Sequence, residues 1–156
     1  MHPRAEEFAD RAHAEYGLTI DVHEFPEGTK TAEDAAAVVG CDVAQIASSL
    51  VFLADDEPVV VVTSGANRVS EEKLAAVLGA ETVSMADAAR IKDALGWSIG
   101  GVPPICHDRP VPVLCDATLT SHDEVWAAAG TPTAVFPIDP ETLVDVANAR
   151  VVDIAE

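Results

Sequence analysis

The first third of the chain shows two periodicities of apolar residues. Residues 3–16 carry apolar side chains three to four positions apart, which is the spacing of one helix face, and Gly17 follows as a stop. Residues 19–25 instead alternate apolar and polar side chains, which predicts a strand. An alanine-rich helix is expected over residues 31–40, and a second, short helix over residues 42–46.

Two short apolar runs dominate the centre of the chain. Runs 50–54 and 59–63 flank the acidic turn of residues 55–58, so a β-hairpin is predicted. Residues 59–62 are consecutive valines, and such a β-branched run is typical of a strand buried on both faces.

The second half of the chain mixes predicted helices and strands without strict alternation. Helices are expected over residues 70–78, 84–95 (capped by Ser84 and Asp87), 122–129 and 139–148, and strands over residues 111–115, 133–136 and 151–154. This mixture favours a single α/β domain over residues 1–156, in which helices pack on a mixed sheet.

Strong acidity adds a second constraint. The chain has 27 Asp and Glu against 9 Lys and Arg, a formal net charge of -18. The acids are spread through every segment, which favours a halophilic surface that tolerates self-repulsion in high salt. Nucleic-acid-binding proteins ordinarily carry a basic footprint. Either nucleic acid is therefore not the ligand, or the contacts are few and confined to one end of it; DNA binding is not expected.

Cysteine usage and the N-terminus bear on the compartment. Cys41, Cys106 and Cys115 are odd in number and lack paired spacing, which predicts reduced thiols. Acidic residues stand near the N-terminus where a signal peptide needs an apolar core, and no apolar run reaches membrane-spanning length. We expect a cytoplasmic protein with no membrane partner.

The loop of residues 96–104, GWSIGGVPP, is the most informative stretch. Adjacent Gly100 and Gly101 allow the backbone to approach a ligand and to aim N–H groups at one oxygen. The prolines that follow would hold the loop rigid, as an oxyanion site requires. The alternative is a tight turn with no ligand.

A nucleophilic triad is also conceivable. It would combine Ser48 or Ser49 with His107 and Asp116, but no nucleophile elbow surrounds either serine. The alternative is that both serines bond local backbone at the start of a strand, and that Asp116 caps the turn after it.

Metal binding is not predicted. Cys106, His107 and Cys115 lack the paired spacing of zinc ligands, so neither a metal nor a cofactor is expected. Trp97 and Trp126 are assigned to the core.

Seven motifs in order resemble the YbaK/ProX family of aminoacyl-tRNA deacylases, which is related to the editing domain of bacterial prolyl-tRNA synthetases. The motifs are TAEDAA (31–36), QIASSLVF (45–52), TSGANRVSEEKL (63–74), GWSIGGVPP (96–104), PVLCDATL (112–119), EVWAAAGTP (124–132) and FPIDPETL (136–143). Together they span nearly the whole chain. The resemblance implies a twisted, partly barrel-like mixed sheet packed by helices.

The same resemblance implies a trans-editing enzyme. Its reaction would be hydrolysis of the ester in mischarged tRNA, with tRNA(Pro) carrying alanine or cysteine as a typical substrate, and a prolyl-tRNA synthetase as a candidate partner. Catalytic roles fall on Gly100, Gly101 and Ser48. The implied substrate-binding residues are Ser49, Asn67, Arg68, Pro104, His107, Asp116, Gly130 and Thr131.

One position departs from the family pattern. The family's lysine in the second motif falls on Ser48, which is short and neutral. This departure leaves two alternatives open. One is a non-catalytic module that binds a small ligand or the tRNA 3′ end, and the other is a hydrolase of a different small ester.

Overall fold

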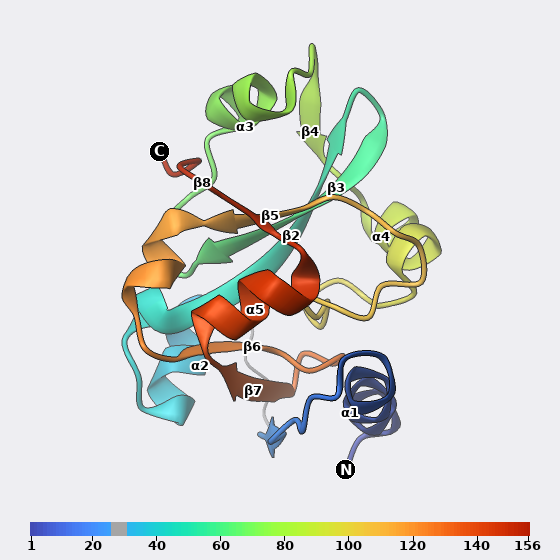
Figure 1. The fold of residues 1–156 in the computed structure, drawn as a ribbon, viewed down its shortest axis with the longest axis vertical. Helices are drawn as coiled ribbons and strands as arrows, with labels where there is room; N and C mark the ends of the chain where they lie inside the picture. Colours follow the sequence, from blue (N-terminus) through green and yellow to red (C-terminus); the bar gives the residue numbers. More distant parts are fainter. Residues whose placement is uncertain (26–30) are drawn as a thin grey trace.

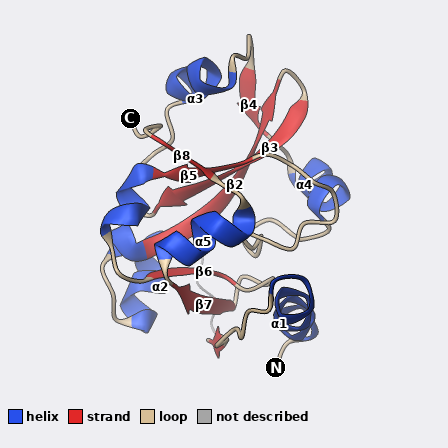
Figure 2. Cartoon of the chain, in the orientation of Figure 1, coloured by secondary structure: helices blue, strands red, loops and turns tan. Residues whose placement is uncertain are grey.

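The computed structural model describes residues 1–25 and 31–156 of the chain, and it confirms the mixed α/β class (Figures 1 and 2). The helices are α1 (Pro3–Tyr16), α2 (Ala32–Val39), α3 (Glu71–Leu78), α4 (Ala88–Leu95) and α5 (Pro140–Ala147), with 3-10 turns η1 (Val43–Gln45) and η2 (Ala117–Ser121). The strands are β1 (His23–Glu24), β2 (Ile46–Ala54), β3 (Glu57–Ser64), β4 (Val83–Met85), β5 (Val113–Asp116), β6 (Val125–Ala128), β7 (Ala134–Ile138) and β8 (Arg150–Val152).

The sheet is built around the β2–β3 hairpin. Its strand order is β1-β7-β6-β2-β3-β5-β8, and β4 pairs with β2 on the side that also carries β6. The hairpin is antiparallel, whereas β6 on β2, β5 on β3 and β8 on β5 are parallel. The turn predicted over residues 55–58 is shorter, because β3 already begins at Glu57. Asp55 and Asp56 form it with φ of 48° and 69°, as tight hairpin turns require.

The valine run of β3 lies within the core. Val59, Val60, Val61 and Val62 are at most 2% exposed. Val60 and Val62 pack in the cluster that includes residues of α1, α4 and α5, and Val59 and Val61 pack in the cluster that includes Leu74 of α3. The β3 strand is therefore buried on both faces.

Side chains at the helix starts cap the backbone much as the sequence predicts. Thr31, Ser70, Asp87 and Asp139 each accept a hydrogen bond from a backbone N–H of the first turn. Ser84 was predicted to share the cap of α4, but it lies in strand β4, which pairs with β2.

One predicted helix is a strand, and one predicted strand is shorter than expected. Residues 122–129 were predicted as a helix, yet Val125–Ala128 form β6, because pairing with β2 and β7 outweighs the helix preference of an alanine-rich segment. The predicted strand over residues 19–25 is reduced to His23–Glu24, the part that reaches β7.

Helix α1 holds the start of the glycine-rich loop in place. Arg4 donates a hydrogen bond to the carbonyl of Gly96, and its guanidinium lies 4.0 Å from the centroid of the Trp97 ring. Phe8 meets Trp97 edge-on at 6.1 Å between centroids. A Cβ on Gly130 would lie 2.7 Å from Trp97, so Gly130 lets these groups pack together. Contacts within the core thus fix where the loop begins.

Candidate functional site

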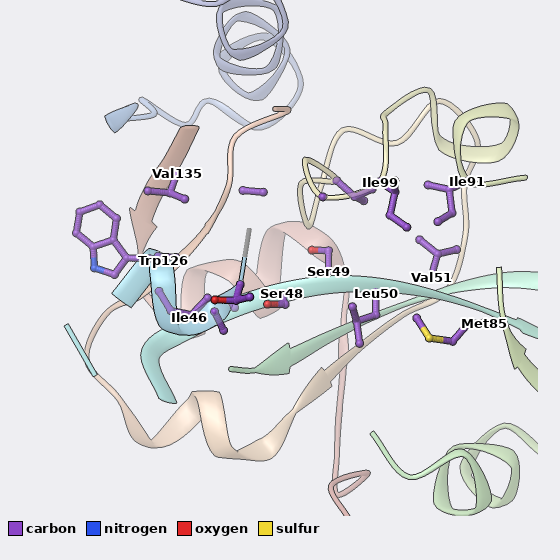
Figure 3. A pocket seen from close by; sticks show the side chains of 17 residues that line it. Ile46, Ser48, Ser49, Leu50, Val51, Met85, Ile91, Ile99, Trp126 and Val135 are labelled. Atoms are coloured by element: carbon purple, nitrogen blue, oxygen red, sulfur yellow. The ribbon is translucent and has the colours of Figure 1, made fainter. Parts of the chain in front are cut away.

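A gap in the pairing of β2 creates the candidate site. On its outer edge, β2 pairs with β6 at Ile46 and Ala47, and with β4 from Phe52 onward. Between these contacts no described strand covers β2, and a cavity of about 250 Å³ opens there (Figure 3). Its lining comes from β2, α2, β4, α4, the glycine-rich loop, β6 and β7: Thr31, Ala32, Ala35, Ile46, Ala47, Ser48, Ser49, Leu50, Val51, Met85, Ile91, Ile99, Gly100, Val102, Trp126, Ala128 and Val135.

The described lining of this cavity carries no acid, base or thiol. Its polar side chains on β2 are Ser48 and Ser49, which point to opposite faces because consecutive strand residues alternate. Ser49 Oγ is buried and makes no hydrogen bond within the described chain. Its unsatisfied hydroxyl makes Ser49 the polar group of this wall most in need of a ligand partner.

Gly100 and Gly101 have different roles. Gly100 lines the cavity with φ of 88°, a conformation that favours glycine, and no described residue accepts a hydrogen bond from its N–H. The N–H of Gly101 instead donates to Ser98 O at 3.0 Å. A Cβ on Gly101 would lie 2.6 Å from Thr131 Cα. Gly101 therefore serves close backbone packing against Thr131, and its N–H is already bonded within the loop.

Asp116 is the centre of a separate polar cluster. Its Oδ2 accepts hydrogen bonds from Thr63 Oγ1 at 3.2 Å and Ser64 N at 3.1 Å. Asn67 Nδ2 donates to the same oxygen at 2.9 Å, and Thr118 N donates to Oδ1 at 3.0 Å. Burial raises the pKa of Asp116, but hydrogen bonds from Asn67, Thr118 and Ser64 outweigh it, so the pKa is lowered. Asp116 joins β3 to the start of η2. This is the turn-capping role that was the alternative to membership of a triad.

Asn67 and Arg68 lie beside the candidate site. They line a neighbouring cavity whose walls include Leu50 and Met85, two residues that also line the first cavity. Arg68 is exposed and forms no ion pair with a described residue. Among residues 1–25 and 31–156, Arg68 is thus a positive charge without an ion-pair partner near the cavity of an acidic protein.

His107 and Pro104 lie in another part of the molecule. Both line a cavity with Tyr16. His107 Nε2 is 2.8 Å from the Pro103 carbonyl, and burial lowers the pKa of the imidazole. The hydrogen bonds of His107 and Asp116 go to other partners, so the structure does not assemble the conceivable triad with Ser48 or Ser49.

Several cavity residues were missed by sequence reasoning. Trp126 was assigned to the core, but it is half-buried, contacts His23 ring to ring at 4.9 Å and lines the cavity. Ile99 and Met85 are each 56% exposed and also line the cavity. Their apolar character is no signal in a sequence, because exposed single apolar residues are common.

The thiols and the helices add little further chemistry. Burial raises the pKa of Cys106 to about 12 and of Cys115 to about 11, which disfavours the reactive thiolate. Across residues 1–25 and 31–156, no group of three or more His, Cys, Asp and Glu residues could hold a metal ion. None of the helices in these ranges is long and apolar enough to cross a bilayer.

Comparison with known proteins identifies the family. The model of the aminoacyl-tRNA editing domain matches residues 26–146. A proline–tRNA ligase of Lactobacillus helveticus (strain DPC 4571) is 33% identical over 103 residues, which cover 66% of this chain but only 18% of the ligase. The uncharacterized protein YwhH of Bacillus subtilis (strain 168) is 28% identical over 134 residues, which cover 84% of this chain and 83% of that protein.

A solved structure agrees over the whole length. It belongs to a candidate trans-editing enzyme for prolyl tRNA synthetase, and it superimposes with a TM-score of 0.94 at 35% identity, covering 100% of this chain and 99% of that one. The family match includes β2, the glycine-rich loop and β6, which together form most of the cavity wall. The chain therefore belongs to the aminoacyl-tRNA editing domain family.

Proposed function

We propose that this chain acts in trans to hydrolyse the ester that joins a small, wrongly attached amino acid to the 3′-terminal adenosine of tRNA(Pro). The observation that carries the proposal is the small cavity on the open edge of β2, in a chain of the editing family. Such an activity meets a physical need. A synthetase pocket gains only about 1–3 kcal/mol per methylene, too little to reject every small competitor.

The protein's part in the reaction is to bind and polarise the ester. Water adds to the carbonyl carbon, the bond to the ribose oxygen breaks, and that oxygen leaves with a proton as the free hydroxyl. Because the described lining holds no basic side chain, the base is a second water or the neighbouring ribose hydroxyl. Ser48, Ser49 and Gly100 would contact the aminoacyl group, while Asn67 and Arg68 would contact the acceptor end from the adjoining cavity.

The test is a deacylation assay with purified protein at low and at molar salt. tRNA(Pro) carrying alanine, cysteine or proline is incubated with the protein, and the loss of charged tRNA is followed. Selective loss of one mischarged species supports editing. Equal rates with and without protein for a full panel of small amino acids would reject it.

One observation favours a second candidate, a non-catalytic module that binds the tRNA 3′ end. Ser48 is neutral, and the described cavity wall has no titratable side chain. If wild-type protein is inactive but Ser48→Lys gains activity, the binding module is supported. Turnover of free aminoacyl esters without dependence on tRNA would instead indicate a hydrolase of another small ester.

A further inference from the structure

In the open stretch of β2, only one residue without a described strand partner directs its backbone N–H and C=O away from β3. Backbone groups of a strand point alternately to its two sides. Ile46 O accepts from Gly65 N, on the β3 side, whereas Val51 O accepts from Ala86 N, on the outer side. By this alternation, the N–H and C=O of Ser49 face outward into the gap, and those of Ser48 and Leu50 face β3.

Within residues 1–25 and 31–156, both backbone groups of Ser49 lack a strand partner. The β6 pairing ends at Ala47, and the β4 pairing begins at Phe52. The next outward residue after Ser49, Val51, already has its carbonyl bonded to Ala86. A peptide strand would collide with β6 or β4, so the gap suits a ligand with the backbone of a single residue.

We propose that the aminoacyl group of the substrate fills this gap as one added strand residue. Its α-ammonium donates to the Ser49 carbonyl oxygen, and the Ser49 N–H donates to the ester carbonyl oxygen. This is the pair of bonds that two directly opposed residues exchange in an antiparallel sheet. The inference rests on the proposed function and specifies how that site holds its substrate.

The pairing has a catalytic consequence. Negative charge gathers on the ester carbonyl oxygen as water adds, and a fixed backbone N–H stabilises that charge. The donor assigned by the geometry is Ser49 N–H, on the wall opposite the glycine-rich loop.

The pairing also has a stereochemical consequence. Directly opposed residues in a sheet place their side chains on the same face. The side chain of an L-amino acid would therefore lie on the face of Ser49 and Val51, near Ile91 and Ile99 (Figure 3). It would also lie beside the unsatisfied Ser49 hydroxyl. A D-amino acid in the same pairing would direct its side chain to the opposite face, toward Leu50.

The first experiment is an NMR titration of the full chain with 3′-deoxy-3′-(L-alanylamino)adenosine, whose amide resists hydrolysis. We expect the Ser49 amide proton to shift downfield and to exchange more slowly with solvent. The amides of Val60 and Val62, inside the paired region, should not move, and the D-alanyl probe should bind at least about tenfold more weakly. Shifts elsewhere without a shift at Ser49 would overturn the proposal.

The second experiment removes the N–H. Ser49→Pro deletes a donor that faces the open edge, a position where a strand tolerates proline. We expect its turnover of mischarged tRNA to be about a hundredfold lower than that of the wild type. Ser49→Ala, which keeps the N–H, should exceed Ser49→Pro at least about tenfold. Thermal unfolding checks that both variants are folded. Equal turnover of two folded variants would overturn the pairing.

The two proposals fail separately. Inactive wild-type protein that still shows the Ser49 shift would reject deacylation and keep the binding mode. Active protein without the shift, and with equal turnover of the two variants, would keep deacylation and reject the binding mode.

Discussion

The Asp116 cluster and the cavity on β2 are two polar regions with opposite hydrogen-bonding states. Each oxygen of Asp116 has a donor in the cluster, and its charge is buried. In the cavity, Ser49 Oγ has no partner in the described chain, and the described lining carries no charge. A conspicuous acid therefore holds two segments together, whereas neutral groups with unused hydrogen bonds are available to a ligand.

The largest effect on stability is expected from a substitution that disrupts the Asp116 cluster. Asp116→Asn places an amide N–H₂ where backbone and side-chain donors converge, and we expect the free energy of unfolding to fall by about 3 kcal/mol. Urea unfolding measures this loss. The same change at exposed Asp123 should cost less than about 0.5 kcal/mol.

Activity and pH sharpen this prediction. Folded Asp116→Asn protein should deacylate within about threefold of the wild type. Because the pKa of Asp116 is lowered by folding, its contribution is present above the ordinary value of 3.8 and is lost as pH falls through the folded pKa. The Asp116→Asn variant should not show this loss of stability at low pH. A variant that is stable but inactive would assign Asp116 to catalysis.

The next effect belongs to the cavity. Gly100→Ala and Gly79→Ala each place a side chain at positive φ, 88° and 65°, and each should cost about 1 kcal/mol of stability. Gly79 lies at the end of α3 with open space around it, whereas Gly100 lines the cavity. We expect deacylation to fall about tenfold for Gly100→Ala alone. Equal activity of the two variants would remove Gly100 from the site.

A smaller effect concerns charge outside both regions. Raising NaCl from about 0.1 M to 2 M shortens the Debye length below about 3 Å, so repulsion within a net charge of -18 weakens. We expect a rise in Tm of about 3 °C, which corresponds to about 1 kcal/mol. A triple variant, Glu6→Gln, Asp10→Asn and Glu124→Gln, should show a smaller rise. A Tm independent of salt would argue against a halophilic surface.

The smallest effect concerns His107. Since burial lowers its pKa below the ordinary 6.5, the neutral imidazole stabilises the fold, and this contribution is lost as pH falls below 6.5. His107→Gln should flatten that part of the stability curve, whereas exposed His13→Gln should not. Deacylation by His107→Gln should stay within about twofold of the wild type from pH 6 to 8. A bell-shaped rate profile that this variant abolishes would place His107 in the reaction.

Much of the fold was predictable because local signals agreed with the tertiary structure. The valines of β3 and the caps Thr31, Asp87 and Asp139 have physical preferences that need no distant partner. The strand β6 could not be predicted, because its alanine-rich sequence favours a helix until β2 and β7 pair with it. The pattern of apolar and polar residues carries no information about the pairing of β6 with β2 and β7.

The site was predictable only in part. Ser48, Ser49 and Gly100, to which the resemblance assigns site roles, line one cavity. The motif could not separate Gly100 from Gly101, because the difference depends on which N–H meets Ser98. Nor could it reveal the gap in β2, which arises from where two distant strands stop pairing.

Helix α1 lies outside the segment that the family model matches but belongs to the folding unit. The family match begins at residue 26, yet Phe8 of α1 is fully buried, between the rings of Trp97 and Phe136. Cutting the chain at the family boundary would therefore expose aromatic core, release Trp97 and lose the anchor of the glycine-rich loop. For protein engineering, the transferable unit is the matched segment together with this N-terminal helix and the C-terminal strand β8, which pairs with β5.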